Sequence, residues 1–291
     1  MAVETVAAII SGLTGEDETR RLIAAQALDR SQVDALRPAI RLTSPVVRGA
    51  YAGEVEAYAV SEGATKTLAS GLMNTVNYQV QAIAIAIPIS NLVFESQEDL
   101  RRNVIDQLTA GIARGIDRTI LRDTESVFGY SVTGKATTAS NTKAAASATA
   151  ITYAEMSDTF GLVEADGYSV NGVIAREGNK GAFRLSETTG GNRFWVPANA
   201  SEPASVFGAP TYFVKSSGTH PVLPQSATTG ETMAVVGDWS QLHWGMYGDV
   251  QIKVNPWAQD YFLKNQTLVL AEVYMGFAVL SGNAFALLVE P

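Results

Sequence analysis

The segment from Asn74 to Gly129 constrains the fold most, because a strand pattern passes directly into a long helix pattern. In its first part, apolar residues alternate with polar or small ones, as in a half-buried strand. The large side chains change phase halfway, which one extra bulged residue near Gln81 would cause. Alanines fill the opposite phase of the second half, so we expect both faces to be covered. They are Ala82, Ala84 and Ala86. Pro88 has no N–H for a ladder bond and is expected to end the strand.

The helix pattern covers residues 96–125. Ser96 can cap it, and Glu98 and Asp99 occupy the first turn, where the helix dipole favours carboxylates. An apolar stripe at helical spacing consists of Leu100, Val104, Leu108, Ile112, Ile116 and Ile120. Such a helix is about 45 Å long at 1.5 Å per residue, which predicts an elongated subunit. We expect surface ion pairs between its acidic and basic residues, namely Asp106, Asp117 and Asp123 with Arg102, Arg114, Arg118 and Arg122.

Length and composition exclude several classes of protein. A chain of 291 residues can bury the cores of two packed subdomains. With no cysteine, thiolate chemistry is excluded, and the two histidines, His220 and His243, are too isolated for a metal-ligand cluster. The net charge of −8 argues against a protein whose main task is to grip nucleic acid. No apolar run is long enough to span a membrane. We expect no metal, no cofactor and no enzymatic activity.

The first 74 residues precede this strand and divide into two segments. Residues 1–48 read as helical in places and then extended, so they form either an arm or a poorly ordered chain end. Residues 49–74 read as two strands around a tip of small residues, which predicts an extended hairpin. Because an isolated two-stranded hairpin is marginally stable in water, it needs a partner surface.

Residues 129–147 are rich in glycine, serine, threonine and alanine, which predicts a loop or linker. The run Gly129-Tyr-Ser-Val-Thr-Gly-Lys135 nearly matches a phosphate-binding loop. However, Ala136 lacks the hydroxyl that would hold magnesium, and the run follows a helix rather than a strand. A nucleotide-binding enzyme that uses the Gly129–Lys135 loop is therefore a remote alternative.

Residues 150–237 have the pattern of a second domain. Thr152 and Glu155 form a capping-box pattern before a helix, and Gly167 can end that helix. A strand at 170–175, a helix at 180–186 and a strand at 233–237 follow. In residues 238–291 we expect return strands, including 267–280 and 284–289. Both of these are expected to join the first strand in one sheet.

Several of these segments resemble the tailed-phage major capsid proteins of the Hong Kong 97 type. The strand end and helix entry from Ile89 to Leu100, with a late Asp117, are similar to the start of the spine helix in that family. Further similar segments are the Glu62-Gly63 pair, the Phe207-Gly-Ala-Pro210 turn and the run Val236-Gly-Asp-Trp-Ser240. The resemblance covers most of the chain.

The resemblance implies an α+β fold with five parts. These are an N-terminal arm at 1–48, the extended hairpin (E-loop) at 49–74, a first part of the peripheral domain at 75–149 with the spine helix at 96–125, an axial domain at 150–237, and return strands with the second part of the peripheral domain at 238–291.

The implied function is that of a major capsid protein, which self-assembles into an icosahedral shell enclosing phage DNA. The implied partners are further copies in pentamers and hexamers, a portal, separate scaffold and decoration proteins, and double-stranded DNA bound non-specifically, with no membrane. The protein would lie in the virion after assembly in the bacterial host cytoplasm. The alternative within the same fold is an encapsulin-type nanocompartment, although the usual N-terminal pattern of encapsulins is not visible.

The resemblance also assigns roles to individual residues. The hairpin tip would contact a neighbouring subunit through Glu62, Gly63, Lys66 and Leu68. In some family members a hairpin lysine forms an isopeptide bond, but here no catalytic glutamate can be assigned, so Lys66 is expected to be a solvated lysine. Apart from the resemblance, three arginines share one face of the long helix, which makes them candidates for a weak contact with packaged DNA in the interior. They are Arg114, Arg118 and Arg122.

Overall fold

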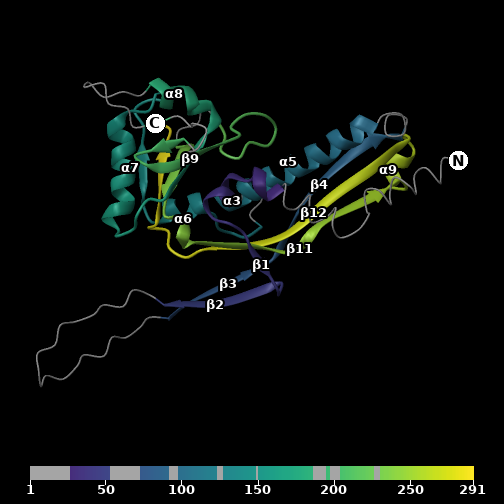
Figure 1. Cartoon of the computed structure of the whole chain (residues 1–291), viewed down its shortest axis with the longest axis horizontal. Helices are drawn as coiled ribbons and strands as arrows, with labels where there is room; N and C mark the ends of the chain where they lie inside the picture. Colours follow the sequence, from purple (N-terminus) through teal and green to yellow (C-terminus); the bar gives the residue numbers. More distant parts are fainter. Residues whose placement is uncertain are drawn as a thin grey trace, which may run out of the picture.

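The structure, a computed structural model, describes residues 27–52, 73–91, 98–122, 127–148, 150–185, 195–196, 204–225 and 230–291. The molecule is elongated (Figure 1). A β-rich domain lies at one end, and long strands and a long helix extend from it to the other end. The α-helices are α3 (Gln32–Leu36), α5 (Glu98–Arg122), α6 (Val132–Thr138), α7 (Tyr153–Ala165), α8 (Lys180–Leu185) and α9 (Gln259–Phe262). Two 3-10 turns are η1 (Glu177–Asn179) and η2 (Trp239–Gln241).

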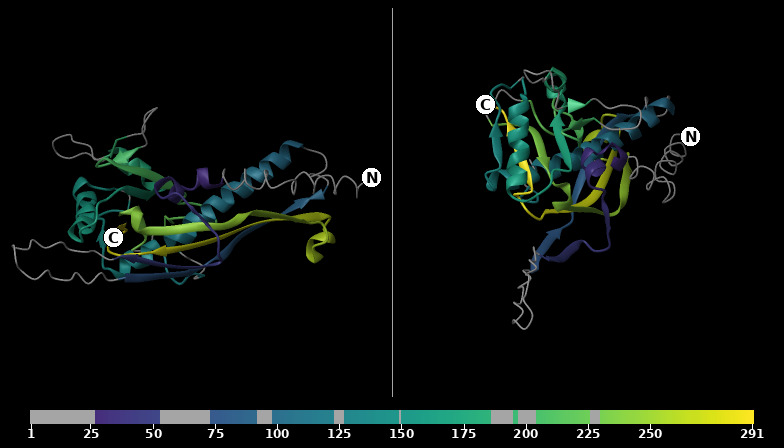
Figure 2. Two further views of the ribbon diagram at one scale, coloured as in Figure 1. Left: turned by 60° about the horizontal axis from the view of Figure 1, so that its bottom comes forward. Right: turned by 60° about the vertical axis from the view of Figure 1, so that its left-hand side comes forward.

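A four-stranded sheet forms the long part of the molecule, in the order β1-β11-β12-β4. Its strands are β1 (Ile40–Leu42), β4 (Gln81–Ser90), β11 (Leu242–Asn255) and β12 (Gln266–Val279). β1 runs parallel to β11, and the other pairs are antiparallel. The long helix α5 runs beside β4 in both views of Figure 2. It approaches closely because it has glycines there: a Cβ at Gly111 would lie 2.5 Å from Cδ1 of Ile85.

The strand expected at residues 74–90 is two strands that belong to different sheets. β3 (Met73–Gln79) pairs with β2 (Val46–Ala52), whereas β4 pairs with β12. Val80 separates them, and its N–H donates to the carbonyl oxygen of Pro45 at 2.9 Å. The predicted bulged residue near Gln81 is therefore wrong, since neither β3 nor β4 shifts its register there. The change of phase results from the passage from one sheet to the next.

Two further expectations for this strand are wrong. Pro88 does not end β4, which continues to Ser90, and Pro88 lies opposite Leu268 of β12. β4 is at the edge of its sheet, where the proline nitrogen can face away from the ladder. The alanine face of β4 is exposed rather than covered, since α5 packs on the isoleucine face alone. The exposed residues are Ala82, Ala84 and Ala86.

The predicted long helix is confirmed as α5. Its apolar stripe is buried at Leu108, Ile112, Ile116 and Ile120. Ser96, the predicted cap, lies outside the described residues. The stripe packs against the four-stranded sheet and continues into the β-rich domain as one hydrophobic core.

The β-rich domain contains a seven-stranded sheet in the order β5-β13-β10-β6-β9-β8-β7. The strands are β5 (Thr142–Ala144), β6 (Gly172–Arg176), β7 (Trp195–Val196), β8 (Ser205–Val206), β9 (Ala209–Val214), β10 (Thr232–Gly237) and β13 (Phe285–Val289). A second core cluster includes residues of α7, α8 and this sheet. The helices and strands predicted within residues 150–237 are present, with small differences in their ends.

Two expectations about this domain are wrong. The last strand, β13, pairs with β10 and β5, not with the first strand in the peripheral sheet. Four of its five residues are fully buried, and α6 and α7 both contact it, which is the environment of a central strand. Residues 129–147 are not only a loop, because they include α6 and β5. Ser131 caps α6 by accepting a hydrogen bond from the Gly134 N–H at 3.1 Å.

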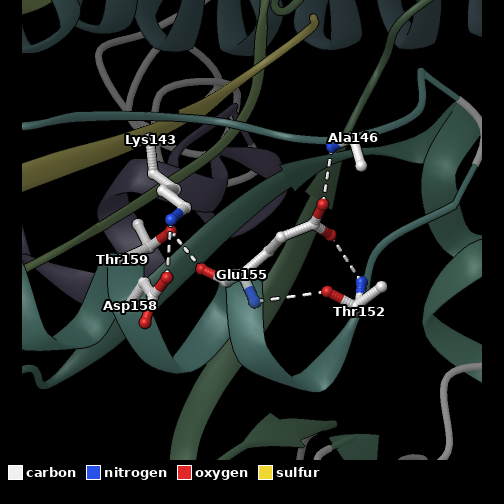
Figure 3. Close-up of polar contacts among 6 residues, drawn as sticks. All are labelled: Lys143, Ala146, Thr152, Glu155, Asp158 and Thr159. Atoms are coloured by element: carbon white, nitrogen blue, oxygen red, sulfur yellow. Dashed lines mark hydrogen bonds and ion pairs between the residues drawn. The ribbon is translucent and has the colours of Figure 1, made fainter.

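The predicted capping box at the start of α7 is confirmed (Figure 3). Oγ1 of Thr152 accepts from the Glu155 N–H at 3.3 Å, and Oε2 of Glu155 accepts from the Thr152 N–H at 2.7 Å. The other carboxylate oxygen accepts from the Ala146 N–H at 2.6 Å. Burial acts to raise the pKa of Glu155, but these hydrogen bonds and the charge of Lys143 outweigh it, so the pKa is lowered. Glu155 therefore fixes the loop between β5 and α7.

Candidate assembly site

The hairpin formed by β2 and β3 is one candidate for contact with another molecule. β2 and β3 pair from Val46 opposite Gln79 to Ala52 opposite Met73. The predicted hairpin is thus confirmed, with a stem that begins before residue 49 and ends after residue 74. It projects from the body of the molecule (Figures 1 and 2). Within the described ranges no third strand joins it. The predicted contact residues of the tip, Glu62, Gly63, Lys66 and Leu68, lie outside the described residues.

Tyr78 attaches the root of the hairpin to the four-stranded sheet. Its side chain is buried and packs over Gly276 of β12, where a Cβ would lie 2.7 Å from the Tyr78 ring. The Tyr78 hydroxyl lies 3.2 Å from Nδ1 of His243. Burial, assisted by the charge of Arg37, lowers the pKa of His243, so the imidazole is neutral at pH 7 and its Nδ1 can accept the hydroxyl hydrogen. The hairpin therefore leaves the body from a packed and hydrogen-bonded base.

Gly276→Ala tests this base. Because the added methyl group would overlap the Tyr78 ring, we expect the free energy of unfolding to fall by about 1–3 kcal/mol. Amide exchange in β3 should also become faster. Urea denaturation and hydrogen exchange of the unassembled subunit measure both effects.

Gly161→Ala is the matched control, since no heavy atom lies within 4 Å of a Cβ at this position in α7. That variant should gain about 0.5–1 kcal/mol from the better helix former. Equal stability changes in the two variants would show that Tyr78 does not need the close approach to Gly276.

The N-terminal arm is attached to α5 by Asp117. Its Oδ1 accepts from the Ser31 hydroxyl at 2.6 Å and from the Val33 N–H at 3.1 Å, and its Oδ2 accepts from the Gln32 N–H at 3.1 Å. These backbone groups are at the start of α3, where N–H groups have no partner within the helix. Asp117 is 3% exposed, and Val33 beside it is fully buried. The carboxylate therefore caps α3 from a helix that lies far away in the sequence.

Burial raises the pKa of Asp117 to about 6. The hydrogen bonds from Ser31, Gln32 and Val33 lower it in part, and the nearby charge of Asp34 adds to the rise. The arm is thus docked on a carboxyl group that titrates near neutral pH.

The prediction that Asp117 forms a surface ion pair on the long helix is wrong, because Asp117 is buried. Asp106 forms an ion pair, but with Arg30 of the arm, at 3.0 Å. Asp123 lies outside the described residues. The prediction considered partners within the helix, whereas the arm supplies the partners of both aspartates that the structure describes.

The structure places the three predicted DNA-facing arginines in different surroundings. Arg114 and Arg118 are half-buried, and Arg118 lines a cavity of about 260 Å³ with Ala82 and Ala84 of β4. Arg122 lies 3.6 Å from a carboxylate oxygen of Glu231, so its charge is partly compensated. Their contact with DNA stays a prediction.

The segment that resembles a phosphate-binding loop is positioned differently from such a loop. Arg122, Ser131, Lys135 and other residues line a cavity of about 380 Å³. However, the Gly134 N–H already donates to Oγ of Ser131, and Val132 begins α6. A phosphate loop instead leaves its backbone N–H groups free for the ligand. The arrangement does not favour nucleotide chemistry.

Among the residues that the structure describes, no cluster of His, Asp or Glu could hold a metal ion. No described helix is long and apolar enough to cross a bilayer. Sequence reasoning did miss two features: the role of Asp117, and an exposed apolar surface around Trp257 at the β11–β12 turn.

Comparisons with known proteins agree with the fold. A chain from Mycobacterium phage Bobi is 16% identical, with a TM-score of 0.67 and 90% coverage of both chains. A chain from Mycobacterium phage Adephagia is 14% identical, with a TM-score of 0.65 over 98% of this chain and 97% of the other. The capsid of an empty GTA particle computed with C5 symmetry is 14% identical, with a TM-score of 0.64 and 90% coverage of both chains.

These likenesses establish the Hong Kong 97-type fold. No curated protein matches the sequence. A family model described as the phage capsid family, however, matches residues 12–289, which is nearly the whole chain. The chain belongs to the phage capsid family.

Proposed function

We propose that this chain is a major capsid protein whose copies build a closed icosahedral shell around double-stranded phage DNA. Membership of the phage capsid family supports the shell. The observation that carries the proposal is the hairpin, whose stem projects from the body and has no third strand in the described part. Because a two-stranded hairpin is marginally stable alone, a neighbouring copy is its natural partner.

The proposed mechanism is geometric rather than catalytic, and the protein is not an enzyme. Each copy extends its hairpin over a neighbour in a pentamer or hexamer, and the tip residues Glu62, Gly63, Lys66 and Leu68 make that contact. The arm, residues 1–48, reaches other copies from the base that Asp117 fixes. Many modest contacts, repeated by symmetry, then hold the shell together.

The proposed further partners are a portal, and scaffold and decoration proteins encoded separately. Assembly takes place in the bacterial host cytoplasm, and the finished protein lies in the virion. Arg114 and Arg118 are proposed to touch packaged DNA through its phosphates, without sequence preference. Arg122 contributes less to this contact with DNA, because the carboxylate of Glu231 partly compensates its positive charge.

Deletion of residues 61–70 tests the mechanism. The shortened subunit is expected to fold, because the stem and its base at Tyr78 remain, but closed shells should be lost or become rare. Electron microscopy and light scattering measure assembly, and circular dichroism measures folding. A variant in which ten Gly and Ser residues replace residues 61–70 keeps the length of the hairpin but removes its side-chain contacts. It therefore shows which of the two assembly requires. Normal shells from the deletion variant would contradict the role of the hairpin.

A further inference from the structure

A cavity of about 380 Å³, here called the α5–α6 cavity, lies where the long helix α5 ends beside α6. Arg122, the last residue of α5, lines it together with Lys135 of α6. The other described residues that line it are neutral: Gly129, Tyr130, Ser131, Gly134 and Thr138. The described wall of the cavity therefore carries two positive charges and no negative one. Its volume is within the range of small-molecule sites.

The guanidinium group of Arg122 has hydrogen-bond donors that no residue in the described part of the chain uses. Its side chain is 27% exposed, and its contact there is the ion pair with Glu231 at 3.6 Å. That distance is too long for a hydrogen bond. A guanidinium group carries five N–H donors in a fixed fork, so a half-buried one needs acceptors. The donors of Arg122 are thus available to a ligand in the cavity.

The ammonium group of Lys135 is held at the same cavity without a carboxylate partner among the described residues. It lies 5.8 Å from the centroid of the Tyr130 ring, which also lines the cavity. Tyr130 is itself fixed, because its hydroxyl donates to the carbonyl oxygen of Phe277 at 2.5 Å and the two ring centroids are 5.2 Å apart. The positive charge of Lys135 is therefore uncompensated at the wall of the cavity.

These surroundings favour a small anion with several oxygen atoms. Two neighbouring cations attract a dianion more strongly than a monoanion, and the fork of Arg122 matches two oxygens of a phosphate group. A metal cation would find no carboxylate or imidazole among the described residues of the wall. A whole nucleotide is disfavoured, because the Gly134 N–H already donates to Ser131 and the Tyr130 ring already packs against Phe277.

We propose that the α5–α6 cavity binds a phosphate-type anion, which accepts hydrogen bonds from the Arg122 guanidinium and the Lys135 ammonium. The bound anion joins the end of α5 to α6, which in turn contacts β13 of the β-rich domain. Because the anion binds the folded subunit, it stabilises the folded state. Its source is either free phosphate and diphosphate or the phosphate groups of DNA. The proposal concerns a single subunit and goes beyond the proposed shell function.

Isothermal titration calorimetry of the unassembled subunit with inorganic diphosphate tests the site, with chloride keeping the ionic strength constant. We expect one saturable site per subunit. Arg122→Gln and Lys135→Gln should each raise the Kd about tenfold or more, since each removes a charge-assisted hydrogen bond. Lys180→Gln is the matched control and should leave the Kd unchanged. The ammonium of Lys180 also lies over an aromatic ring, 5.2 Å from the centroid of Phe213, but outside the cavity.

Glu231→Gln gives an effect of the opposite sign. It removes the carboxylate that competes with the anion for Arg122, so diphosphate should bind about threefold more tightly or better. General damage to the fold would weaken binding rather than strengthen it, so this variant separates the site from such damage. Circular dichroism melting of each variant without ligand checks that it is folded.

A short DNA duplex added in competition distinguishes the two sources of the anion. Competition with diphosphate that is lost in Lys135→Gln assigns the site to phosphate groups of DNA, whereas absence of competition assigns it to the free anion. The proposal is overturned if the wild type shows no saturable binding of diphosphate. It is also overturned if Arg122→Gln and Lys135→Gln bind diphosphate as tightly as Lys180→Gln. Each result is obtained on unassembled subunits, so it is independent of whether the chain forms shells.

Discussion

Glu290→Gln lowers the free energy of unfolding by about 3–5 kcal/mol, because it leaves the buried positive charge of Arg176 without a compensating carboxylate. The Arg176 side chain is 0% exposed, the Glu290 side chain is 4% exposed, and NH1 of Arg176 lies 2.5 Å from Oε1 of Glu290. The same guanidinium donates to the carbonyl oxygens of Pro224 and Ala148 and to Oδ1 of Asn179. This pair therefore joins β6, the chain after β13 and two loops of the β-rich domain.

Urea denaturation of the unassembled subunit, followed by the fluorescence of buried tryptophans, measures the change. Asp158→Asn is the matched control, since it removes one partner of the exposed pair Lys143–Asp158 and should cost less than about 1 kcal/mol. The double variant Arg176→Met/Glu290→Leu should recover much of the stability, because apolar residues often replace a buried pair at little cost. A Glu290→Gln variant within 1 kcal/mol of wild type would contradict this account.

Asp117→Ala is expected to release the N-terminal arm from α5. The Ser31 hydroxyl and the N–H groups of Gln32 and Val33 lose their acceptor in a buried site. The free energy of arm docking should fall by roughly 2–4 kcal/mol. Hydrogen exchange of the Gln32 and Val33 amides should become about 30-fold faster or more, as measured by mass spectrometry or NMR. Asp106→Ala is the matched control, because its exposed pair with Arg30 ties the same arm to the same helix and should matter little.

The raised pKa of Asp117 also predicts a pH dependence. Because its pKa is about 6 in the folded state and 3.8 in the unfolded chain, the folded state binds the proton more tightly. The stability contribution is full below pH 3.8 and is lost as the pH rises through about 6. Between pH 7.5 and pH 4.5 it amounts to about 2 kcal/mol. The wild type should gain this much relative to Asp117→Asn, whose amide does not titrate. Parallel pH profiles of the two proteins would show that Asp117 is not the titrating group.

Local patterns predicted those elements whose signals lie within one segment of the chain. The stripe from Leu108 to Ile120 fixes α5, and the Thr152–Glu155 pair marks the start of α7. The change of phase before β4 was visible too, although its cause, a change of sheet, was not. In each case neighbours in the sequence determine the local structure.

The features that escaped prediction depend on residues far apart in the sequence. Ser31 and Asp117 are 86 positions apart, so the sequence could not show that Asp117 caps α3 rather than forming a surface ion pair. The apolar residues of β13 would suit a buried strand in the four-stranded or in the seven-stranded sheet, so the pattern alone does not choose between them. In the structure β13 lies in the seven-stranded sheet, where α6 and α7 cover it. Pro88 was misjudged because the prediction could not tell an edge strand from a central one.

Negative-stain electron microscopy of the purified protein, with light scattering on the same sample, shows whether this subunit assembles into shells. The chain should be expressed alone and also together with a scaffold protein. We expect uniform closed shells, or rings of five and six subunits, in at least one of the two preparations. A monodisperse monomer or dimer in both, at the highest soluble concentration, would contradict the claim that this subunit builds a shell.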